Sequence, residues 1–199
     1  MRLKTTCEAK GIKFTVLKPK LSFDHYAFEK IVHKRDGTIG HGYSWCGGTC
    51  RWGTSLKTNT LDNYCKHAIV YVGIAADETK RLGKLAPNKQ APLAEWHITE
   101  QQALNYCYNH GFYFTETMID NGSKSTYRLY DLLDRVSCWC CANKNLKELY
   151  NMYKYLPNYW AKLKEYQVRT NRPYRRDGKN IVDLEKQFKQ KRGKYKRHA

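Results

Sequence analysis

Cysteine constrains this chain more than any other residue type, because five of its eight cysteines fall in two tight clusters. One cluster is the run Cys46-Gly47-Gly48-Thr49-Cys50, and the other is Cys138-Trp139-Cys140-Cys141. Disulfides are typical of small secreted proteins, but the first residues contain no apolar segment followed by a small-residue cleavage site. We therefore expect a cytoplasmic chain and interpret the clusters as metal-binding or redox-active.

The spacing of the two clusters suits a shared inorganic centre. Two thiolates separated by two or three residues can converge on one metal, and a second pair can complete four ligands. A set of sulfur ligands favours zinc or an iron–sulfur cluster over magnesium or calcium. Free thiols in a reducing cytoplasm are the simpler alternative, and Cys140 can replace a neighbour or act as a nucleophile. The candidate ligands are Cys46, Cys50, Cys138 and Cys141.

Positive charge points to anionic partners. The 199 residues include 36 Lys and Arg against 18 Asp and Glu, a net charge of +18, and residues 162–199 alone carry +10. This basic C-terminal tail suits the phosphate backbone of a nucleic acid, although a solvated, disordered tail over 189–198 has the same composition. The mean hydropathy of −0.78 and the lack of an apolar run near ~18 residues predict no membrane partner.

Strand and helix patterns predict an α/β fold. The apolar run 68–74 is typical of a strand covered on both faces, and alternation predicts a second strand over 12–17. Thr99 and Gln102 form a capping-box pattern that begins a helix ending at Gly111. The run 120–125 is polar and rich in turn residues, which predicts a loop.

The C-terminal third is predicted to be helical. A short helix over 127–133 leads to the second cysteine cluster, which would therefore lie on a loop between helices. Apolar residues then follow helical spacing over 146–156, and Pro157 begins another helix. Beyond it, only the stretch 181–188 offers an apolar helix face.

Several runs taken together resemble a known family. In chain order they are Trp45-Cys46-Gly47-Gly48-Thr49-Cys50-Arg51-Trp52, then Lys57, Val72-Gly73-Ile74-Ala75-Ala76-Asp77-Glu78-Thr79-Lys80-Arg81, Pro92-Leu93-Ala94-Glu95-Trp96 and Asp134-Arg135-Val136-Ser137-Cys138-Trp139-Cys140-Cys141. They resemble the phosphoadenosine phosphosulfate (PAPS) reductase family of the PP-loop ATPase superfamily, in particular its phage and gut-bacterial, adenine nucleotide alpha-hydrolase-like members. The resemblance covers residues 10–165.

The resemblance implies an α/β, Rossmann-like (adenine nucleotide alpha-hydrolase-like) sheet over 1–135, followed by a cysteine-containing helical region and basic tail over 136–199. It implies binding of an adenine nucleotide, ATP or PAPS, and a role in sulfur transfer or sulfonucleotide reduction. The four cysteines named above would then be the ligands of the iron–sulfur cluster or zinc. The residues implied at the nucleotide or sulfate are Arg51, Lys57, Asp77, Glu78 and Arg81. Asp77 and its neighbours also suit a solvated helix start.

The chain departs from the family at the phosphate loop. Family members begin with a strand and a Ser-Gly-Gly-x-Asp-Ser loop, whose backbone amides hold the phosphates. No such run occurs in this sequence. The resemblance therefore implies an N-terminally incomplete sheet, and activity would require a partner chain or a homo-oligomer that supplies the loop.

Two other functions agree with the same sequence. One is a metal-stabilised nucleic-acid-binding protein that uses its basic tail, for which salt-sensitive binding without nucleotide affinity is expected. Nucleic-acid binding and the PAPS reductase-like function would be combined in a sulfurtransferase that acts on nucleic acid. The other is a nonfunctional fragment, whose missing strands would leave an exposed apolar sheet edge.

Overall fold

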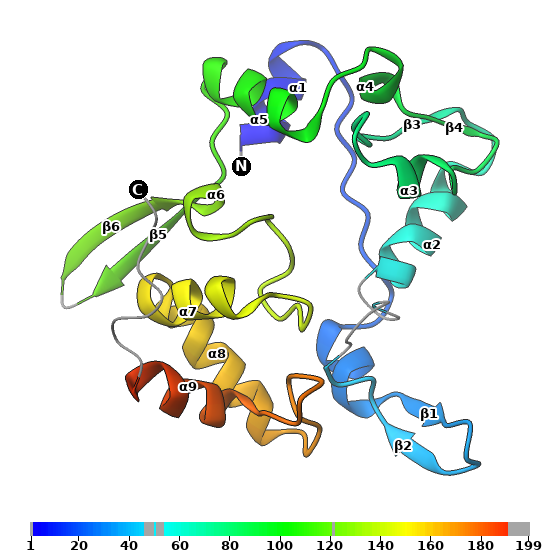
Figure 1. Ribbon diagram of the computed structural model, residues 1–199. Helices are drawn as coiled ribbons and strands as arrows, with labels where there is room; N and C mark the ends of the chain where they lie inside the picture. The colour runs from blue at the N-terminus through cyan, green and yellow to red at the C-terminus, as the bar shows by residue number, and fades with distance from the viewer. Residues whose placement is uncertain (1, 46–49, 51–53, 121, 191–199) are drawn as a thin grey trace. The chain divides into compact units, whose positions relative to one another are not determined.

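The computed structural model describes residues 2–45, 50, 54–120 and 122–190. Two compact units make up the chain: unit 1 is Met1–Lys18 with Thr58–Tyr113, and unit 2 is Pro19–Lys57 with Phe114–Ala199. The described residues form helices and three two-stranded sheets (Figure 1). The prediction of a mixed α/β fold is confirmed at this level, but these small sheets do not amount to the single Rossmann-like sheet that the resemblance implies.

Unit 1 is built from short elements. Parallel pairing joins β3 to β4, with Val70 opposite Lys89 and Tyr71 opposite Gln90. The carboxylate of Asp62 on α2 forms an ion pair of 2.7 Å with the Nζ of Lys89 on β4, and this contact links the helix to the small sheet. The elements are α1 (Arg2–Ala9), most of α2 (Thr54–Tyr64), β3 (Val70–Tyr71), α3 (Thr79–Leu82), β4 (Lys89–Gln90), α4 (Pro92–Glu95) and α5 (Glu100–Asn109).

Two strand predictions in unit 1 are wrong. The stretch 12–17 forms no strand, and of the run 68–74 only Val70–Tyr71 is paired. Ile69 and Tyr71 are 63% and 68% exposed, so this strand is not covered on both faces. The reason is that a ladder of two residues offers too little surface for helices to cover. The buried residues of this region are instead Ile74 and Ala75, which follow the strand.

The predicted helix after Thr99 is confirmed as α5. Thr99 accepts a hydrogen bond of 3.2 Å from the backbone amide of Gln102, whose side chain accepts one of 2.9 Å from the amide of Thr99. Gly111 follows with a φ of +73°, a left-handed conformation that glycine adopts without steric cost. Local chemistry alone therefore defines both ends of this helix.

Unit 2 contains two hairpins and the longer helices. In the first hairpin β1 pairs antiparallel with β2, with Val32 opposite Gly40, and in the second β5 pairs antiparallel with β6. The elements are η1 (a π-helix, His25–Glu29), β1 (Ile31–His33), β2 (Ile39–His41), β5 (Thr115–Asp120), β6 (Ser123–Arg128), α6 (Leu129–Leu132), α7 (Leu146–Tyr155), α8 (Pro157–Val168) and α9 (Ile181–Gln190).

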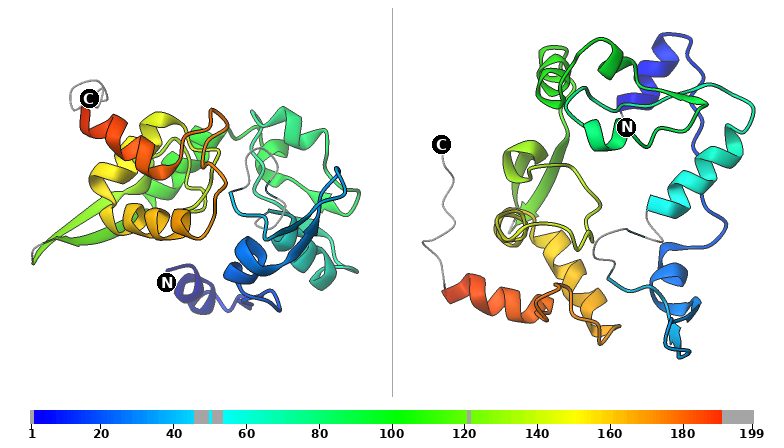
Figure 2. Two further views of the ribbon diagram at one scale, coloured as in Figure 1. Left: turned by 90° about the horizontal axis from the view of Figure 1, so that it is seen from below. Right: turned by 45° about the vertical axis from the view of Figure 1, so that its right-hand side comes forward.

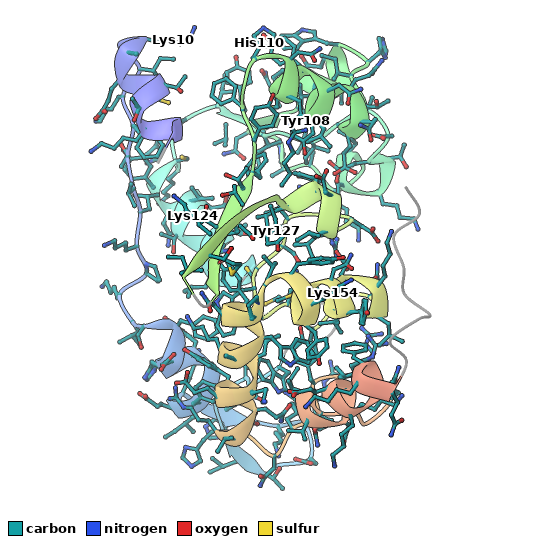
Figure 3. All side chains as sticks on the ribbon, turned by 90° about the vertical axis from the view of Figure 1, so that its left-hand side faces the viewer. Lys10, Tyr108, His110, Lys124, Tyr127 and Lys154 are labelled. Carbon is teal, nitrogen blue, oxygen red and sulfur yellow. The ribbon has the colours of Figure 1, made fainter. Side chains whose placement is uncertain are left out.

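The β5–β6 hairpin corrects the loop predicted over 120–125. The strands continue through most of that run, with Met118 opposite Ser125. Met118 is buried, and the ring of Tyr127 on β6 lies 5.6 Å from that of Tyr155 on α7. Figure 3 shows Tyr127 on the hairpin beside α7, which carries Lys154. Packing of one strand face against α7 thus stabilises a polar segment that reads as a loop in isolation.

Three helices form the core of unit 2, as their apolar periodicity predicts. The helix α8 packs against both α7 and α9, an arrangement visible in Figure 2. Asn145 caps α7 through a capping box with Glu148, and Pro157 occupies the first turn of α8. The side chains with 0% exposure belong to all three helices, and they are Leu149, Leu163, Ile181, Leu184 and Phe188. No helix in the described part of the chain is long and apolar enough to cross a membrane.

Candidate functional site

The loop between α6 and α7 carries the second group of cysteines, as predicted. The backbone amide of Cys141 donates a 3.0 Å hydrogen bond to the carbonyl of Cys138, so the loop turns tightly at these residues. Cys138 is exposed, Cys141 is half-buried, and Cys140 is 4% exposed. Together with the half-buried Cys50 they form what we call the thiol cluster. No disulfide joins any two of the cysteines that the structure describes.

Cys50 lies within electrostatic reach of this loop. Burial, with smaller contributions from the negative charges of Cys138, Cys141 and Cys50, raises the pKa of the Cys140 thiol to about 12. Cys50 also packs against the same apolar core that contains Cys140. The structure therefore brings a member of the first cysteine run to the second run, although the two are far apart in the sequence.

Two lysines accompany the thiol cluster. The Nζ of Lys57 lies 3.4 Å from the Sγ of Cys138. Lys144 is only 3% exposed and donates a hydrogen bond to the hydroxyl of Ser137. Burial lowers the pKa of Lys144, while the charges of Glu148, Cys141 and Cys138 act in the opposite direction.

Aromatic rings close one side of the cysteine loop. The hydroxyl of Tyr174 donates a 2.6 Å hydrogen bond to the carbonyl of Cys141, and burial raises its pKa well above the usual value. The ring of Trp45 meets that of Tyr174 edge-on at 5.0 Å, and the indole NH of Trp45 donates to Gln167. Such rings exclude water from the backbone of the loop.

Trp139, the aromatic residue inside the cysteine loop, belongs to a second group of rings. It lies 5.0 Å from the ring of Tyr166 on α8 and 5.9 Å from that of Phe23. The Nζ of Lys162 stands 4.5 Å above the Trp139 ring, a cation–π contact. Tyr166 in turn donates a 2.6 Å hydrogen bond to Asp24. Contacts with α8 and with the segment before η1 thus fix the loop.

The thiol cluster fits a thiophilic metal in its donor chemistry. Sulfur ligands from two segments, with lysines nearby to balance negative charge, are the donors that zinc and iron–sulfur clusters use. Among the residues that the structure describes, no three of His, Cys, Asp and Glu lie close enough together to hold a metal ion. Cys46, the remaining candidate ligand, lies outside the described residues.

The predicted nucleotide residues fall in different places. Asp77, Glu78 and Arg81 lie in unit 1, at the start of α3. The carboxylate of Asp77 accepts a 3.0 Å hydrogen bond from the amide of Glu100, and Glu78 accepts hydrogen bonds from Ala75 and Arg81. These contacts stabilise the first turns of α3 and α5. Lys57 lies beside Cys138 in unit 2, and Arg51 lies outside the described residues.

Sequence reasoning overlooked Lys144 and the role of Tyr174. Lys144 follows the cysteines by three positions, a spacing that could have drawn attention to it, but its burial has no sequence signal. Tyr174 comes from the segment after α8 and reaches the loop only through the tertiary fold. The arrangement as a whole gathers thiols and ammonium groups, the chemical groups that a soft metal and an anion would need. No protein-family model, curated protein or solved structure matches this chain.

Proposed function

We propose that this chain is a PAPS reductase-like protein that acts in adenine-nucleotide-dependent sulfur transfer or sulfonucleotide reduction. In this proposal the mixed α/β fold is a variant of the Rossmann-like family fold, and a partner chain or second copy supplies the missing phosphate loop. The motifs quoted above carry the family resemblance, and the thiol cluster supplies the chemistry.

One observation carries the proposal most directly: Cys50 packs against the apolar core that contains Cys140, close enough for its charge to act on that thiol. The two cysteine runs are far apart in the sequence, so the approach of Cys50 to the second run is a result of the tertiary fold. Thiols gathered from separate segments and accompanied by cations are typical of a metal or sulfur-handling site.

Each of the remaining residues has a role in the proposal. Lys57 places an ammonium beside Cys138, where it would attract the sulfate or phosphate oxygens of a sulfonucleotide. Arg51 would offer a bidentate guanidinium to the same oxygens. The resemblance also implies nucleotide contacts for Asp77, Glu78 and Arg81 of unit 1, and Arg81 would have to exchange its ion pair with Glu78 for a phosphate in that role.

The proposed metal centre uses cysteines of both runs. Cys50, Cys138 and Cys141 would hold it together with Cys46, which requires these described cysteines to move closer together than the structure places them, and the buried Cys140 would remain a packing residue. An iron–sulfur cluster supplies electron transfer, whereas zinc supplies a charged structural crosslink. The buried Lys144 would balance part of the negative charge of the thiolates.

Anaerobic purification with metal and sulfide analysis tests the proposal. Wild-type protein is expected to contain stoichiometric iron with inorganic sulfide, or stoichiometric zinc. The double variant Cys138→Ser, Cys141→Ser should lose this metal. The matched control is Cys65→Ser, Cys107→Ser, since both of these cysteines lie in unit 1 and neither belongs to the thiol cluster.

Two results would contradict the metal site: wild-type protein that contains no metal, or a double variant that keeps it. Calorimetric titration with PAPS and with ATP tests the nucleotide part separately. Binding should weaken in Lys57→Ala and stay unchanged in Lys66→Ala, which replaces an exposed lysine of unit 1. Equal binding by both variants would exclude Lys57 from the nucleotide site.

A further inference from the structure

Unit 2 contains a cavity of about 850 Å³ that the thiol chemistry does not use. Its walls come from the β1–β2 hairpin, the residues that follow it, and the segment 170–176 after α8. Among the described residues that line it there is no carboxylate. Its cations are Lys34, Arg35, Arg172, Arg175 and Arg176.

Two of these arginines are held in place by the fold. Arg172 donates a 2.9 Å hydrogen bond to the carbonyl of Tyr43, and Arg175 donates one of 3.3 Å to the carbonyl of Lys144. The Nε of Arg175 is buried without a hydrogen-bond partner within the described chain, and the carboxylate of Asp177 is 3.6 Å away. A buried donor of this kind gains free energy from an anionic acceptor.

The other three cations lie at the exposed part of the cavity. Lys34, Arg35 and Arg176 are exposed. The carboxylate of Asp36, next to Arg35 in the hairpin, accepts hydrogen bonds from the amide and hydroxyl of Thr38, and these bonds together with the charge of Lys34 lower its pKa. The hairpin and the 170–176 segment therefore form a hollow lined by five cations, of which Arg175 is paired with Asp177 at 3.6 Å.

We propose that this cavity binds the sugar-phosphate backbone of a single-stranded nucleic acid. Cations spread around a hollow match a chain of phosphates better than one phosphate, since each contact releases counterions along the strand. Proteins that bind single strands combine a positively charged groove with rings on which bases stack. His33, His41 and Tyr43 line the cavity and supply rings of this kind, although the Nζ of Lys30 already lies 5.4 Å over the ring of Tyr43.

A double helix fits the cavity less well than a single strand. A duplex is a stiff convex cylinder, so its phosphates would reach the exposed cations of the cavity but not the half-buried Arg175. A flexible strand can enter and place successive phosphates near Arg172 and Arg175. This inference concerns the β1–β2 hairpin and the folded segment 170–176 rather than residues 189–198 at the end of the chain, and it does not depend on the sulfur chemistry proposed above.

The cavity shares two rings with the surroundings of the thiol cluster. Trp45 and Tyr174 line it, and Tyr174 also donates to the carbonyl of Cys141. A bound strand would therefore lie against the rings that fix the cysteine loop. If the thiol cluster handles sulfur, this position makes a nucleic acid strand a suitable acceptor.

Fluorescence anisotropy of the full chain with a labelled single strand of about 12 nucleotides tests the proposal. The variant Lys34→Glu, Arg176→Glu reverses two exposed cations of the cavity. Lys124→Glu, Lys186→Glu is the matched control, because it removes the same charge from exposed residues on β6 (Figure 3) and α9 that do not line the cavity. Circular dichroism confirms that both variants fold.

The cavity variant should bind at least ~10-fold more weakly at moderate salt, and the control should stay within about twofold of wild type. The neutral variant Lys34→Gln, Arg176→Gln should reduce the slope of log K against log salt by about 1.4, since each lost phosphate contact of a single strand removes about 0.7. This second measurement remains informative if charge reversal impairs folding.

Three results would overturn the proposal. Equal losses in the cavity and control variants would assign binding to net charge or to the tail. Tighter binding of a duplex of the same sequence would exclude a single-strand site. Displacement of the strand by inorganic phosphate or ATP at equal phosphate concentration would identify the cavity as a site for small anions.

Discussion

Tyr174 and Cys141, which belong to separate segments of unit 2, are joined by a hydrogen bond of 2.6 Å from the tyrosine hydroxyl to the cysteine carbonyl. Tyr174 is 2% exposed, so water does not compete for this bond. The segment after α8 is thereby fixed to the loop that carries three of the cysteines. Through Trp45, whose ring meets that of Tyr174, the same contact extends to the end of the first hairpin.

Replacing the tyrosine should loosen the cysteine loop. In Tyr174→Phe the carbonyl of Cys141 loses its hydrogen-bond donor, and we expect the free energy of unfolding to fall by about 1–3 kcal/mol. Urea unfolding followed by tryptophan fluorescence measures this change. Tyr127→Phe, at a half-buried tyrosine of the same unit, should cost less than about 0.5 kcal/mol. Equal effects of the two substitutions would mean that the hydrogen bond contributes nothing measurable.

The cysteines of the loop should differ in reactivity toward iodoacetamide. Only the thiolate reacts, and a pKa of about 12 leaves about one Cys140 thiol in 10,000 ionised at pH 8. Burial also blocks access to it. Peptide mass spectrometry should find Cys140 unlabelled in the native protein and labelled after unfolding in urea. Labelling of Cys140 as fast as the exposed Cys138, under native conditions, would contradict the described loop.

Glu185 should contribute to the acid sensitivity of unit 2. Hydrogen bonds from Lys189, Lys164 and Trp160, at 2.7, 3.0 and 3.1 Å, lower the pKa of its carboxyl to about 2 from the usual 4.5. The carboxylate therefore stabilises the fold above pH 4.5, and this contribution is lost as the pH falls from 4.5 toward 2.

The variant Glu185→Gln tests this pH dependence. It should lower the free energy of unfolding at pH 7 by about 1–2 kcal/mol, and it should flatten the fall in stability between pH 4.5 and 2. Glu165→Gln, at an exposed carboxylate of α8, is the control for general charge effects. The free energy of unfolding is measured by urea unfolding at each pH. If it falls between pH 4.5 and 2 as steeply in Glu185→Gln as in wild type, another carboxyl group causes the acid sensitivity.

Gly42 should tolerate no side chain. Its φ is +65°, and a Cβ built there would lie 2.1 Å from the backbone oxygen of the buried Ala27. Gly42→Ala is expected to cost more than about 2 kcal/mol, because strain and a backbone clash add. Gly37→Ala, in the same hairpin at φ +80° with open space around it, should cost only about 1–2 kcal/mol. Similar costs in urea unfolding would contradict the close approach of the hairpin to η1.

The helices could be predicted where residues close in sequence mark the positions at which they begin and end. The capping box at Thr99 and the apolar spacing after Asn145 depend on residues within one or two turns, and α5 and α7 follow them. Strands could not, because their stability comes from partners distant in sequence. The apolar run 68–74 found a partner of only two residues, whereas the polar run 120–125 lies in a six-residue hairpin ladder that contacts α7 through Tyr127.

Part of the candidate site could also be predicted. Clustering of the cysteines singled out Cys50, Cys138 and Cys141, and the structure places Cys50 against the apolar core that contains Cys140 of the second run. Nothing in the sequence indicated that Lys144 would be buried beside them or that Tyr174 would bind the loop. The cationic cavity is a similar case, because Lys34 and Arg172 lie in segments that meet only in the folded unit.

By itself, the sequence determined the excess of positive charge, the two cysteine runs and the helices with strong local signals. These properties depend on composition and on neighbours a few residues apart. Only the tertiary structure decided that Cys50 packs against the core that contains Cys140, and that Tyr174 donates a hydrogen bond to the carbonyl of Cys141. It also decided that the arginines of segment 170–176 line one cavity with the first hairpin. Such long-range contacts arise because apolar faces such as those of α7, α8 and α9 bury each other, and the polar side chains on the connecting segments are carried into place with them.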